Sequence, residues 1–275
     1  MDHKRILTLQ DISCVGQCSL TVALPIISAC GVETAVLPSA VLSTHTAGFS
    51  GFTCRDLTED MSAICAHWQK EGITFDAIYT GYLGSAEQID HVLAIRQACC
   101  SEGLLIADPA MADGGKLYPA FDMAFVQRMK ALCAAADYVL PNLTEACLLT
   151  DTPYPAAGYD QAFITALLAK LQALGCKNVV LTGIGYREGF TGIEVLQQQG
   201  RRYYEHPLLA NSCHGTGDIY AASFVGALVR GKDVYDAARI AADYTVTCMK
   251  ATEKEHWYGA RFEPVLGELI AAVNS

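Results

Sequence analysis

The stretch Gly215-Thr216-Gly217-Asp218, which precedes a run of small and apolar residues from Ile219 to Arg230, decides how this sequence is interpreted. Two glycines allow the backbone to turn tightly and to approach a ligand closely. A glycine turn that opens a helix directs backbone N–H groups toward an anion, and the helix dipole adds to the attraction. Asp218 beside such an anion hole suggests phosphoryl transfer, in which the carboxylate accepts a proton from an attacking hydroxyl. The same residues also fit an ordinary turn with a capping aspartate.

The bulk properties limit the class of protein. The chain has 275 residues, a net charge of -10 and 52% hydrophobic residues, and no low-complexity linker or internal repeat divides it. We therefore expect one domain over residues 1–275. The acidic charge argues against nucleic acids and anionic membranes as partners. The uncharged stretch 12–32 contains Gly, Pro, Gln and small polar residues, so we do not expect it to span a membrane.

Twelve cysteines are present, but no Cys-x-x-Cys pair occurs and most of the cysteines lie within apolar stretches. This spacing argues against a zinc site. A basic segment followed by an apolar one, which would indicate export, is not found. We interpret the cysteines as reduced, buried small side chains, and we expect a cytoplasmic protein.

Short apolar strands alternate with amphipathic helices along the chain. Strands are expected at 5–9, 33–38, 76–80, 104–107, 138–140 and 177–182, and a hairpin at 189–196 and 202–206 around 197–201. Helices are expected at 20–30, 56–71, 86–100, 121–134, 145–149, 160–174, 218–230, 233–250 and 263–273. This order predicts a three-layer αβα fold, with a mostly parallel central sheet and an antiparallel edge hairpin. Ligands of such sheets bind beyond the carboxyl ends of the strands.

Polar residues follow successive strands at the edge where ligands are expected. Asp108 ends one strand, and Asp113 lies on the glycine-rich loop after it. These carboxylates could hold Mg²⁺ through water, because Mg²⁺ keeps several water ligands in proteins. Asn142 and Glu145 follow the next strand, where Thr144 is the expected helix cap and Glu145 could bind a metal ion or orient its waters. Each residue alone has a structural explanation, but together they indicate a metal–phosphate site.

Further segments suit the nucleotide and the acceptor. Thr182 and Gly183 end another buried strand and either line the nucleotide phosphates or provide a small-residue exit from the strand. His45 and Thr46 lie in a glycine-rich loop with hydroxyls and aromatics, and Tyr82 follows the third strand. Aromatic faces beside hydroxyl and amide groups suit a flat heteroaromatic ring. A single histidine such as His45 is more often a structural group than a ligand.

Four segments resemble the pyridoxal kinases of the ribokinase-like superfamily. They are the glycine loop with Asp218, Asp108-Pro-Ala-Met-Ala-Asp113 with Gly-Lys-Leu-Tyr118, Pro141-Asn142-Leu-Thr-Glu145, and Gly81-Tyr82-Leu-Gly-Ser-Ala-Glu-Gln88. The last segment and His45-Thr46 are typical of the pyridoxal branch. The resemblance extends over nearly the whole chain and implies the ribokinase-like fold. It also implies a phosphotransferase with an alcohol acceptor, which phosphorylates the 5′-hydroxymethyl group of pyridoxal, pyridoxine or pyridoxamine in vitamin B6 salvage.

The resemblance assigns roles to individual residues. Asp218 is implied as the base, and the backbone of Gly215, Thr216 and Gly217 as the anion hole. The nucleotide and the metal ion are assigned to residues at strand ends, namely Asp108, Asp113, Asn142, Glu145, Thr182 and Gly183. The acceptor ring is bordered by Thr46 and Tyr82, with His45 beside them. ATP and Mg²⁺ are implied as cofactors, with a monovalent cation, K⁺ or Na⁺, beside Mg²⁺, and the protein is expected to be a homodimer.

The sequence departs from the family at Gln10-Asp11-Ile12-Ser13, where Gln-Ser-His is usual and the serine meets the pyridine ring. Asp11 could pair with a protonated ring nitrogen or change specificity. His214, before the glycine loop, is a second departure. Three other functions stay open: a hydroxymethylpyrimidine kinase of thiamine synthesis, a sugar or nucleoside kinase, and a non-catalytic nucleotide-binding protein on the same fold. The intact Asp218 and glycine loop argue against the last of these.

Overall fold

The computed structural model describes residues 3–210 and 213–275 and is built on a nine-stranded sheet in the order β11-β10-β9-β8-β5-β4-β1-β2-β3. The strands from β9 through β2 in this order run parallel, and the edge strands are antiparallel. The parallel strands are β1 (Arg5–Ser13), β2 (Glu33–Leu42), β4 (Ala77–Thr80), β5 (Leu104–Ala107), β8 (Tyr138–Val139) and β9 (Val179–Ile184). The antiparallel strands are β3 (Cys54–Asp56), β10 (Phe190–Gln197) and β11 (Gly200–Pro207).

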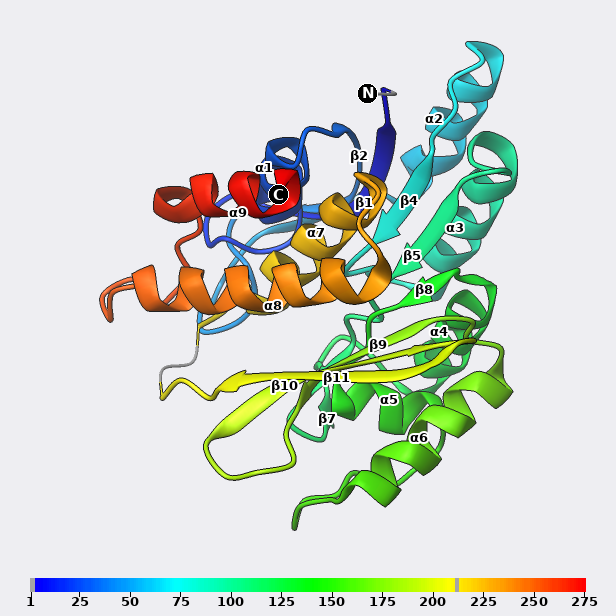
Figure 1. The fold of residues 1–275 in the computed structure, drawn as a ribbon. Coiled ribbons are helices and arrows are strands. Elements are labelled where there is room, and N and C mark those ends of the chain that lie inside the picture. Colours follow the sequence, from blue (N-terminus) through cyan, green and yellow to red (C-terminus); the bar gives the residue numbers. More distant parts are fainter. Residues whose placement is uncertain (1–2, 211–212) are drawn as a thin grey trace.

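Helices cover both faces of the sheet (Figure 1). One face carries α1 (Leu20–Ala29), α7 (Thr216–Val229), α8 (Val234–Ala251) and α9 (Leu266–Asn274). The other face carries α2 (Thr58–Lys70), α3 (Ala86–Cys99), α4 (Met123–Ala135), α5 (Leu143–Leu149) and α6 (Gln161–Leu174). The predicted three-layer fold with a mostly parallel sheet and an antiparallel edge hairpin is confirmed.

Side chains of the central strands alternate between two hydrophobic cores. Ile6 of β1 and Tyr79 of β4 pack with α1 and α7, whereas Leu7 and Ile78 pack in the core beneath α3 and α4. Successive side chains of a strand point to opposite faces, so a strand covered on both sides is apolar throughout. This arrangement explains the continuous apolar runs in the sequence.

The first two strands are longer than predicted. β1 continues to Ser13 and β2 to Leu42, whereas the sequence suggested ends at 9 and 38. Gln10 and Asp11 looked like the end of a strand, but the pairing with β2 continues past them after a register shift between Gln10 and Ile12. Neither β3 nor the small hairpin of β6 (Ala112–Asp113) and β7 (Lys116–Leu117) was predicted, because such short strands carry no apolar run.

Several helix starts also differ from the predictions. The helix expected at 145–149 begins at Leu143, and Asn142 rather than Thr144 is its cap. The helix expected at 218–230 begins at Thr216. The helix expected at 263–273 begins at Leu266, after a short 3₁₀ turn at Glu263–Val265 that contains a proline. The turn of the edge hairpin is tighter than expected, because β10 and β11 are separated only by residues 198–199.

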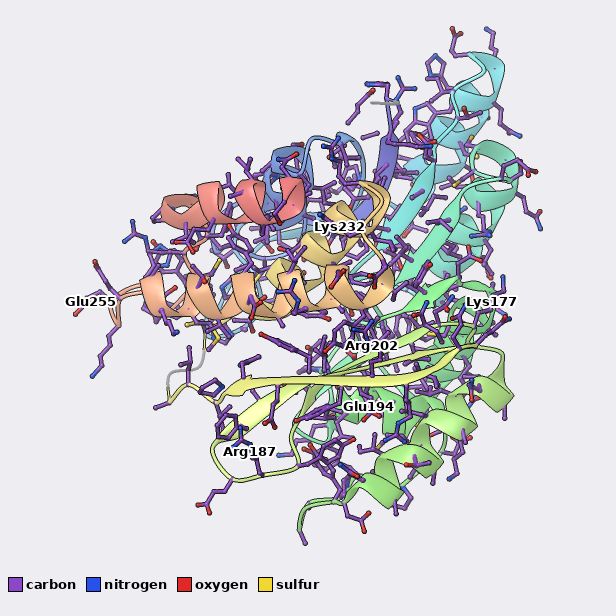
Figure 2. All side chains as sticks on the ribbon, in the orientation of Figure 1. Lys177, Arg187, Glu194, Arg202, Lys232 and Glu255 are labelled. Carbon is purple, nitrogen blue, oxygen red and sulfur yellow. The ribbon has the colours of Figure 1, made fainter. Side chains whose placement is uncertain are left out.

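The edge hairpin carries charged side chains with defined partners (Figure 2). Glu194 on β10 is only 1% exposed, and its carboxylate accepts hydrogen bonds from the Tyr186 hydroxyl and the Arg201 guanidinium. Arg187, in the turn before β10, forms an ion pair with Glu205 at 2.7 Å. Burial of a carboxylate is costly unless its oxygens are paired or hydrogen-bonded, and these two contacts supply partners for Glu194.

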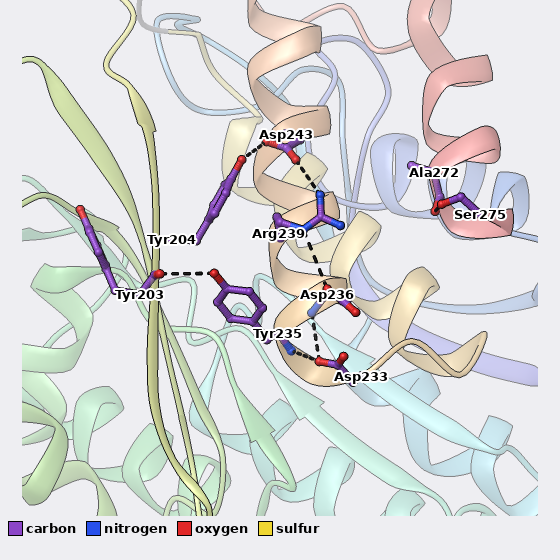
Figure 3. Close-up of polar contacts among 9 residues, drawn as sticks. All are labelled: Tyr203, Tyr204, Asp233, Tyr235, Asp236, Arg239, Asp243, Ala272 and Ser275. Atoms are coloured by element: carbon purple, nitrogen blue, oxygen red, sulfur yellow. Dashed lines mark hydrogen bonds and ion pairs between the residues drawn. The ribbon is translucent and has the colours of Figure 1, made fainter.

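Polar contacts attach α8 to the edge strand β11 (Figure 3). The Tyr204 hydroxyl donates to the carboxylate of Asp243, and the Tyr235 hydroxyl donates to the Tyr203 carbonyl oxygen at 3.3 Å. The guanidinium carbon of Arg202 lies 3.5 Å from the centre of the Tyr235 ring, in cation–π geometry. Of the helices in the described ranges, none is long and apolar enough to cross a bilayer.

Candidate functional site

The residues selected from the sequence lie along one edge of the sheet, because the carboxyl ends of its parallel strands meet there. The order of neighbouring strands brings together groups that are distant in sequence. Across the sheet these groups are Thr182 on β9, Asn142 and Glu145 after β8, Asp108 after β5, Tyr82 after β4, Asp11 on β1, and His45 and Thr46 after β2. Asp218 lies in the first turn of α7, above the same edge.

The glycine loop forms the N-terminus of α7. Gly215 is the cap residue, with a left-handed φ of 76°, and its carbonyl accepts a hydrogen bond from the Ile219 amide at 3.0 Å. A Cβ atom on Gly215 would lie 2.1 Å from the carbonyl oxygen of Gln17, so only glycine fits there. Gly217 is exposed, and a Cβ atom on it would meet no heavy atom within 4 Å. The first N–H groups of a helix lack intrahelical partners, so this end offers donors to an anion.

Asp218 is half-buried beside this loop. The pKa of its carboxyl is raised to about 7, mainly by burial; hydrogen bonding from the Ser19 backbone lowers it, and the nearby charge of Asp11 adds a smaller increase. A base works best when its pKa lies near the operating pH. The position and the pKa of Asp218 therefore suit proton abstraction from a hydroxyl.

Asp108 and Glu145 form a second group of carboxylates close to Asp218. Burial raises the pKa of Asp108, and the charges of Glu145 and Asp218 raise it further. A cation near Asp108 would offset the repulsion between these charges, and carboxylate oxygen atoms suit Mg²⁺. The described residues contain no group of three or more His, Cys, Asp or Glu side chains placed to hold a metal ion. Mg²⁺ at this position would therefore need phosphate and water ligands, as it commonly does.

Glu145 also has a structural role that the sequence did not reveal. Glu145 is 2% exposed, and its Oε2 accepts a hydrogen bond from the backbone N–H of Asn142 at 2.9 Å. In return, Asn142 Oδ1 accepts a hydrogen bond from the backbone N–H of Glu145 at 3.0 Å. These reciprocal bonds form a capping box. Glu145 Oε1 accepts the amides of Met111 at 3.1 Å and Ala112 at 3.5 Å. Glu145 thus fixes the loop that follows Asp108.

The other residues that the sequence predicted to bind the nucleotide differ in their exposure and in whether their side chains are already hydrogen-bonded. The Asn142 Nδ2 donates to the Ala112 carbonyl oxygen at 2.8 Å, and Thr182 forms a parallel bridge with Asn142. Asp113 is exposed in the turn of the β6–β7 hairpin and accepts the amide of the following glycine at 2.8 Å. Gly183 is exposed, with a φ of 68°. Asp113 and Gly183 are therefore accessible, whereas the side chain of Asn142 is already engaged in local structure.

Asp11 and Tyr82, which the sequence predicted to border the acceptor, lie close together. Asp11 is 5% exposed, and its carboxylate accepts the Ser13 hydroxyl at 2.9 Å and is also hydrogen-bonded by the Ser19 side chain. Burial raises the pKa of Tyr82 to about 12, with smaller contributions from the charges of Asp11 and Cys54. The Tyr82 ring is stacked at a tilt against Phe121, with 5.3 Å between the ring centres. The serines and Phe121 were not selected from the sequence, because nothing in their spacing marks them.

His45 is a structural group rather than a free ligand. It is 5% exposed, and its Nδ1 accepts the Ala47 amide at 3.1 Å. This bond assigns the proton to Nε2, which donates to the Tyr258 carbonyl oxygen at 2.7 Å. The His45 ring packs against His214, with 5.4 Å between the ring centres. Both ring nitrogens are therefore occupied, while the neighbouring Thr46 is exposed.

A cavity of about 560 Å³ lies elsewhere, at the amino-terminal edge of the sheet near Lys4, Asp76 and Gly103. That edge carries none of the residues selected above. The position of the functional site therefore rests on the convergence of carboxylates and a helix N-terminus, and not on cavity size.

Comparisons with known proteins agree on the family. The sequence profile of the phosphomethylpyrimidine kinase family matches residues 24–265. A Bacteroides thetaiotaomicron crystal structure, provisionally named a phosphomethylpyrimidine kinase and containing pyridoxal, is 36% identical and superposes with a TM-score of 0.90 over 98% of this chain and 96% of its own. Pyridoxal kinase from Lactobacillus plantarum is 30% identical, with a TM-score of 0.89 over 98% and 97% of the two chains. The pyridoxal kinase of Haemophilus influenzae is 28% identical over 205 residues, or 68% of this chain and 69% of its own.

The two glycines of the loop allow a matched test of the anion-hole geometry. We expect Gly215→Ala to lower the free energy of unfolding by about 1–3 kcal/mol, because its left-handed φ and the Gln17 carbonyl both oppose a side chain. Gly217→Ala is the control: its position is helical and open, so stability should stay unchanged or rise by up to about 1 kcal/mol. Urea unfolding of both variants measures this, and equal effects would contradict the geometry.

Proposed function

Because the chain belongs to the phosphomethylpyrimidine kinase family, we propose that it is an ATP-dependent kinase that phosphorylates the 5′-hydroxymethyl group of pyridoxal, pyridoxine or pyridoxamine. The observation that carries the proposal is Asp218, a carboxyl group with a pKa of about 7 in the first turn of α7, directly after an open glycine loop. The pyridoxal bound to the similar Bacteroides protein supports this class of acceptor. The resemblance to pyridoxal kinases that the motifs indicated is confirmed.

The reaction uses the two parts of this site together. Asp218 accepts the proton of the acceptor hydroxymethyl group. At the same time, the oxygen of that hydroxymethyl group forms a bond to the terminal phosphorus of ATP. The bond between that phosphorus and the bridging oxygen breaks, and ADP leaves. The backbone N–H groups of Thr216 and Gly217 face the charge that gathers on the transferred phosphoryl oxygens. Catalysis of this kind depends on positioning and electrostatics more than on covalent chemistry.

The residues at the strand ends would hold the nucleotide and its metal ion. We assign Asp108 as a ligand of Mg²⁺. Glu145 fixes the loop that follows Asp108, and through this loop it would orient the water molecules of the metal ion. When bound, Mg²⁺ supplies positive charge that offsets the carboxylates and the phosphates. Asp113, Asn142, Thr182 and Gly183 are assigned to the nucleotide phosphates. A monovalent cation beside Mg²⁺ is part of the proposal, and a comparison of rates in K⁺, Na⁺ and a bulky organic cation tests it.

The acceptor side is assigned to Asp11, Thr46 and Tyr82, with His45 supporting the loop that carries Thr46. The runner-up acceptor is hydroxymethylpyrimidine, which the name of the matching family favours. It is also a flat ring with a hydroxymethyl group. All twelve cysteines are free thiols, which fits the reducing cytoplasm that we propose as the location.

Replacement of the base tests the proposed function directly. We expect Asp218→Asn to lower kcat by about 10²–10⁴-fold with a B6 vitamer, because the hydroxyl would lose its proton acceptor. The Kd for ATP should stay within a few-fold of the unmodified protein, because the backbone anion hole is retained. A coupled ADP-release assay and a nucleotide titration give both values. A variant with near-normal kcat would remove Asp218 from the mechanism.

The raised pKa of Asp218 also predicts a pH-dependent effect on stability. The carboxyl titrates near 3.8 when unfolded and near 7 in the folded protein, so folding is disfavoured progressively as pH rises from about 4 to 7. Asn cannot ionise, so we expect Asp218→Asn to raise Tm at pH 8 and to have little effect at pH 4. Thermal unfolding across this range checks the sign. A Tm that falls at pH 8 would be inconsistent with a carboxyl whose pKa is higher in the folded protein than in the unfolded chain.

The Mg²⁺ dependence of the reaction rate distinguishes a metal-related role of Glu145 from a purely structural one. We expect Glu145→Gln to raise the Mg²⁺ concentration for half-maximal rate, because it removes a charge near the metal and its NH₂ group cannot accept one of the backbone N–H bonds that hold the loop after Asp108. Asp108→Asn, at the assigned Mg²⁺ ligand, should raise it further. Rates measured over a Mg²⁺ series give both values. If Glu145→Gln changes neither this concentration nor kcat, Glu145 serves only as a cap and loop anchor.

We propose that the active protein is a homodimer, as the resemblance implies. The acceptor side has no large lid in the described residues, only loops and the short strand β3, so a neighbouring subunit would help to shield it. Light scattering at the assay concentration should give about twice the mass of the chain. A fully active monomer under these conditions would disprove this part of the proposal.

A further inference from the structure

Ser19, in the loop between β1 and α1, has backbone angles that are characteristic of glycine. Its φ is 56° and its ψ is −129°. In residues 3–210 and 213–275, only Asp151 is a second non-glycine residue with a positive φ. Such angles strain a residue that carries a Cβ atom, and they persist only where the surroundings impose them, often at functional sites.

The surroundings of Ser19 impose this conformation. Its carbonyl oxygen accepts the amides of Val22 at 3.0 Å and Ala23 at 2.9 Å, at the start of α1. The residue also forms an antiparallel bridge with Ile12 of β1, and it is 6% exposed. Ser19 therefore anchors the helix to the strand through its backbone.

The Ser19 hydroxyl is not used in the way that is usual for a serine at a helix start. A serine there normally caps the helix by accepting a backbone N–H, yet the Ser19 side chain makes no capping bond. Its hydroxyl instead hydrogen-bonds the carboxylate of Asp11, and its backbone N–H reaches the carboxylate of Asp218. The same residue thus contacts the acceptor-side carboxylate and the base.

A glycine would supply the same backbone N–H without strain, so the hydroxyl is what distinguishes serine at this position. Asp11 is buried, with the Ser13 and Ser19 hydroxyls as donors and Tyr82 beside it. A buried carboxylate with only neutral donors is suited to pair with a cation. A flat ring with a protonated nitrogen has that property.

We propose that Ser19 is a positioning residue that fixes the Asp11 carboxylate relative to Asp218, so that a protonated heteroaromatic ring at Asp11 presents its hydroxymethyl group to the base. This inference rests on the proposed function, because it takes the acceptor to be such a ring. It extends that function because it explains the choice of acceptor by two residues, Asp11 and Asp218. Ser19, with its strained backbone, sets the distance between them. Loss of the hydroxyl would retain both carboxylates but would no longer fix the Asp11 carboxylate relative to Asp218.

Two variants separate the hydroxyl from the backbone strain. Ser19→Gly and Ser19→Ala both remove the hydroxyl, but only glycine relieves the strain. We expect both to lower kcat/KM for B6 vitamers by about 10- to 100-fold, because small errors in position cost this much. The KM for ATP should stay within about twofold. We expect Ser19→Gly to raise Tm by about 2–4 °C, whereas Ser19→Ala should not raise it.

A purely structural serine would lose activity and stability together. Opposite changes in Tm and kcat/KM for Ser19→Gly are therefore the expected signature. Wild-type kcat/KM in Ser19→Gly, or a lower Tm, would overturn the proposal.

A double-mutant cycle with Asp11→Ser tests the contact itself. Once Asp11 is replaced, Ser19→Gly should cause little further loss of kcat/KM, and it should raise Tm more than in the unmodified protein, because no carboxylate contact is lost. Additive effects on both quantities would overturn the coupling. The Tm measurements need no acceptor. If the protein phosphorylates none of the B6 vitamers, the proposed function is refuted, but the Tm values still show whether Ser19 and Asp11 are coupled.

Discussion

The site depends on how the first turn of α7 is seated against the loop between β1 and α1. The Gln17 carbonyl occupies the space where any side chain on residue 215 would lie, and the Ser19 backbone reaches the carboxylate of Asp218. A single loop therefore places both the anion hole and the base. This contact joins residues that are about 200 positions apart in the sequence. Because β1 is a central strand held by β2 and β4, the loop that follows it has a rigid support.

The same arrangement concentrates charge at one edge of the sheet. Burial raises the pKa of Asp108, Glu145 and Asp218, and the charges of Glu145 and Asp218 raise the pKa of Asp108 further. Groups with such shifts oppose folding when they are ionised, and they are typical of sites that handle protons, phosphates and metal ions. The two large cores on either side of the sheet supply the stability that offsets this effect. A cation at this edge would offset the charge of these carboxylates.

The sequence predicted that several candidate residues would lie together, because they stand at or just after the ends of predicted strands. Asp108, Asn142 and Thr182 are examples, and the strand order places them side by side. The partners of these residues could not be predicted in the same way. Glu145 completes a capping box with Asn142 and anchors a loop 33 or 34 residues earlier, and His45 uses both ring nitrogens in contacts with distant or local backbone. The unusual backbone of Ser19 has no signature in residue type, since serine is common at helix starts. These features depend on loop geometry, which apolar periodicity does not report.

The most direct measurement of the central claim is a panel of acceptors incubated with the unmodified protein, ATP and Mg²⁺, with products identified by mass spectrometry. The panel contains pyridoxal, pyridoxine, pyridoxamine and hydroxymethylpyrimidine, with a sugar and a nucleoside as comparisons. We expect ADP formation to depend on the acceptor, and we expect the phosphate to be found on the hydroxymethyl group of at least one B6 vitamer at the highest kcat/KM of the panel. Phosphorylation of hydroxymethylpyrimidine alone, or nucleotide binding without any phosphorylated product, would contradict this account.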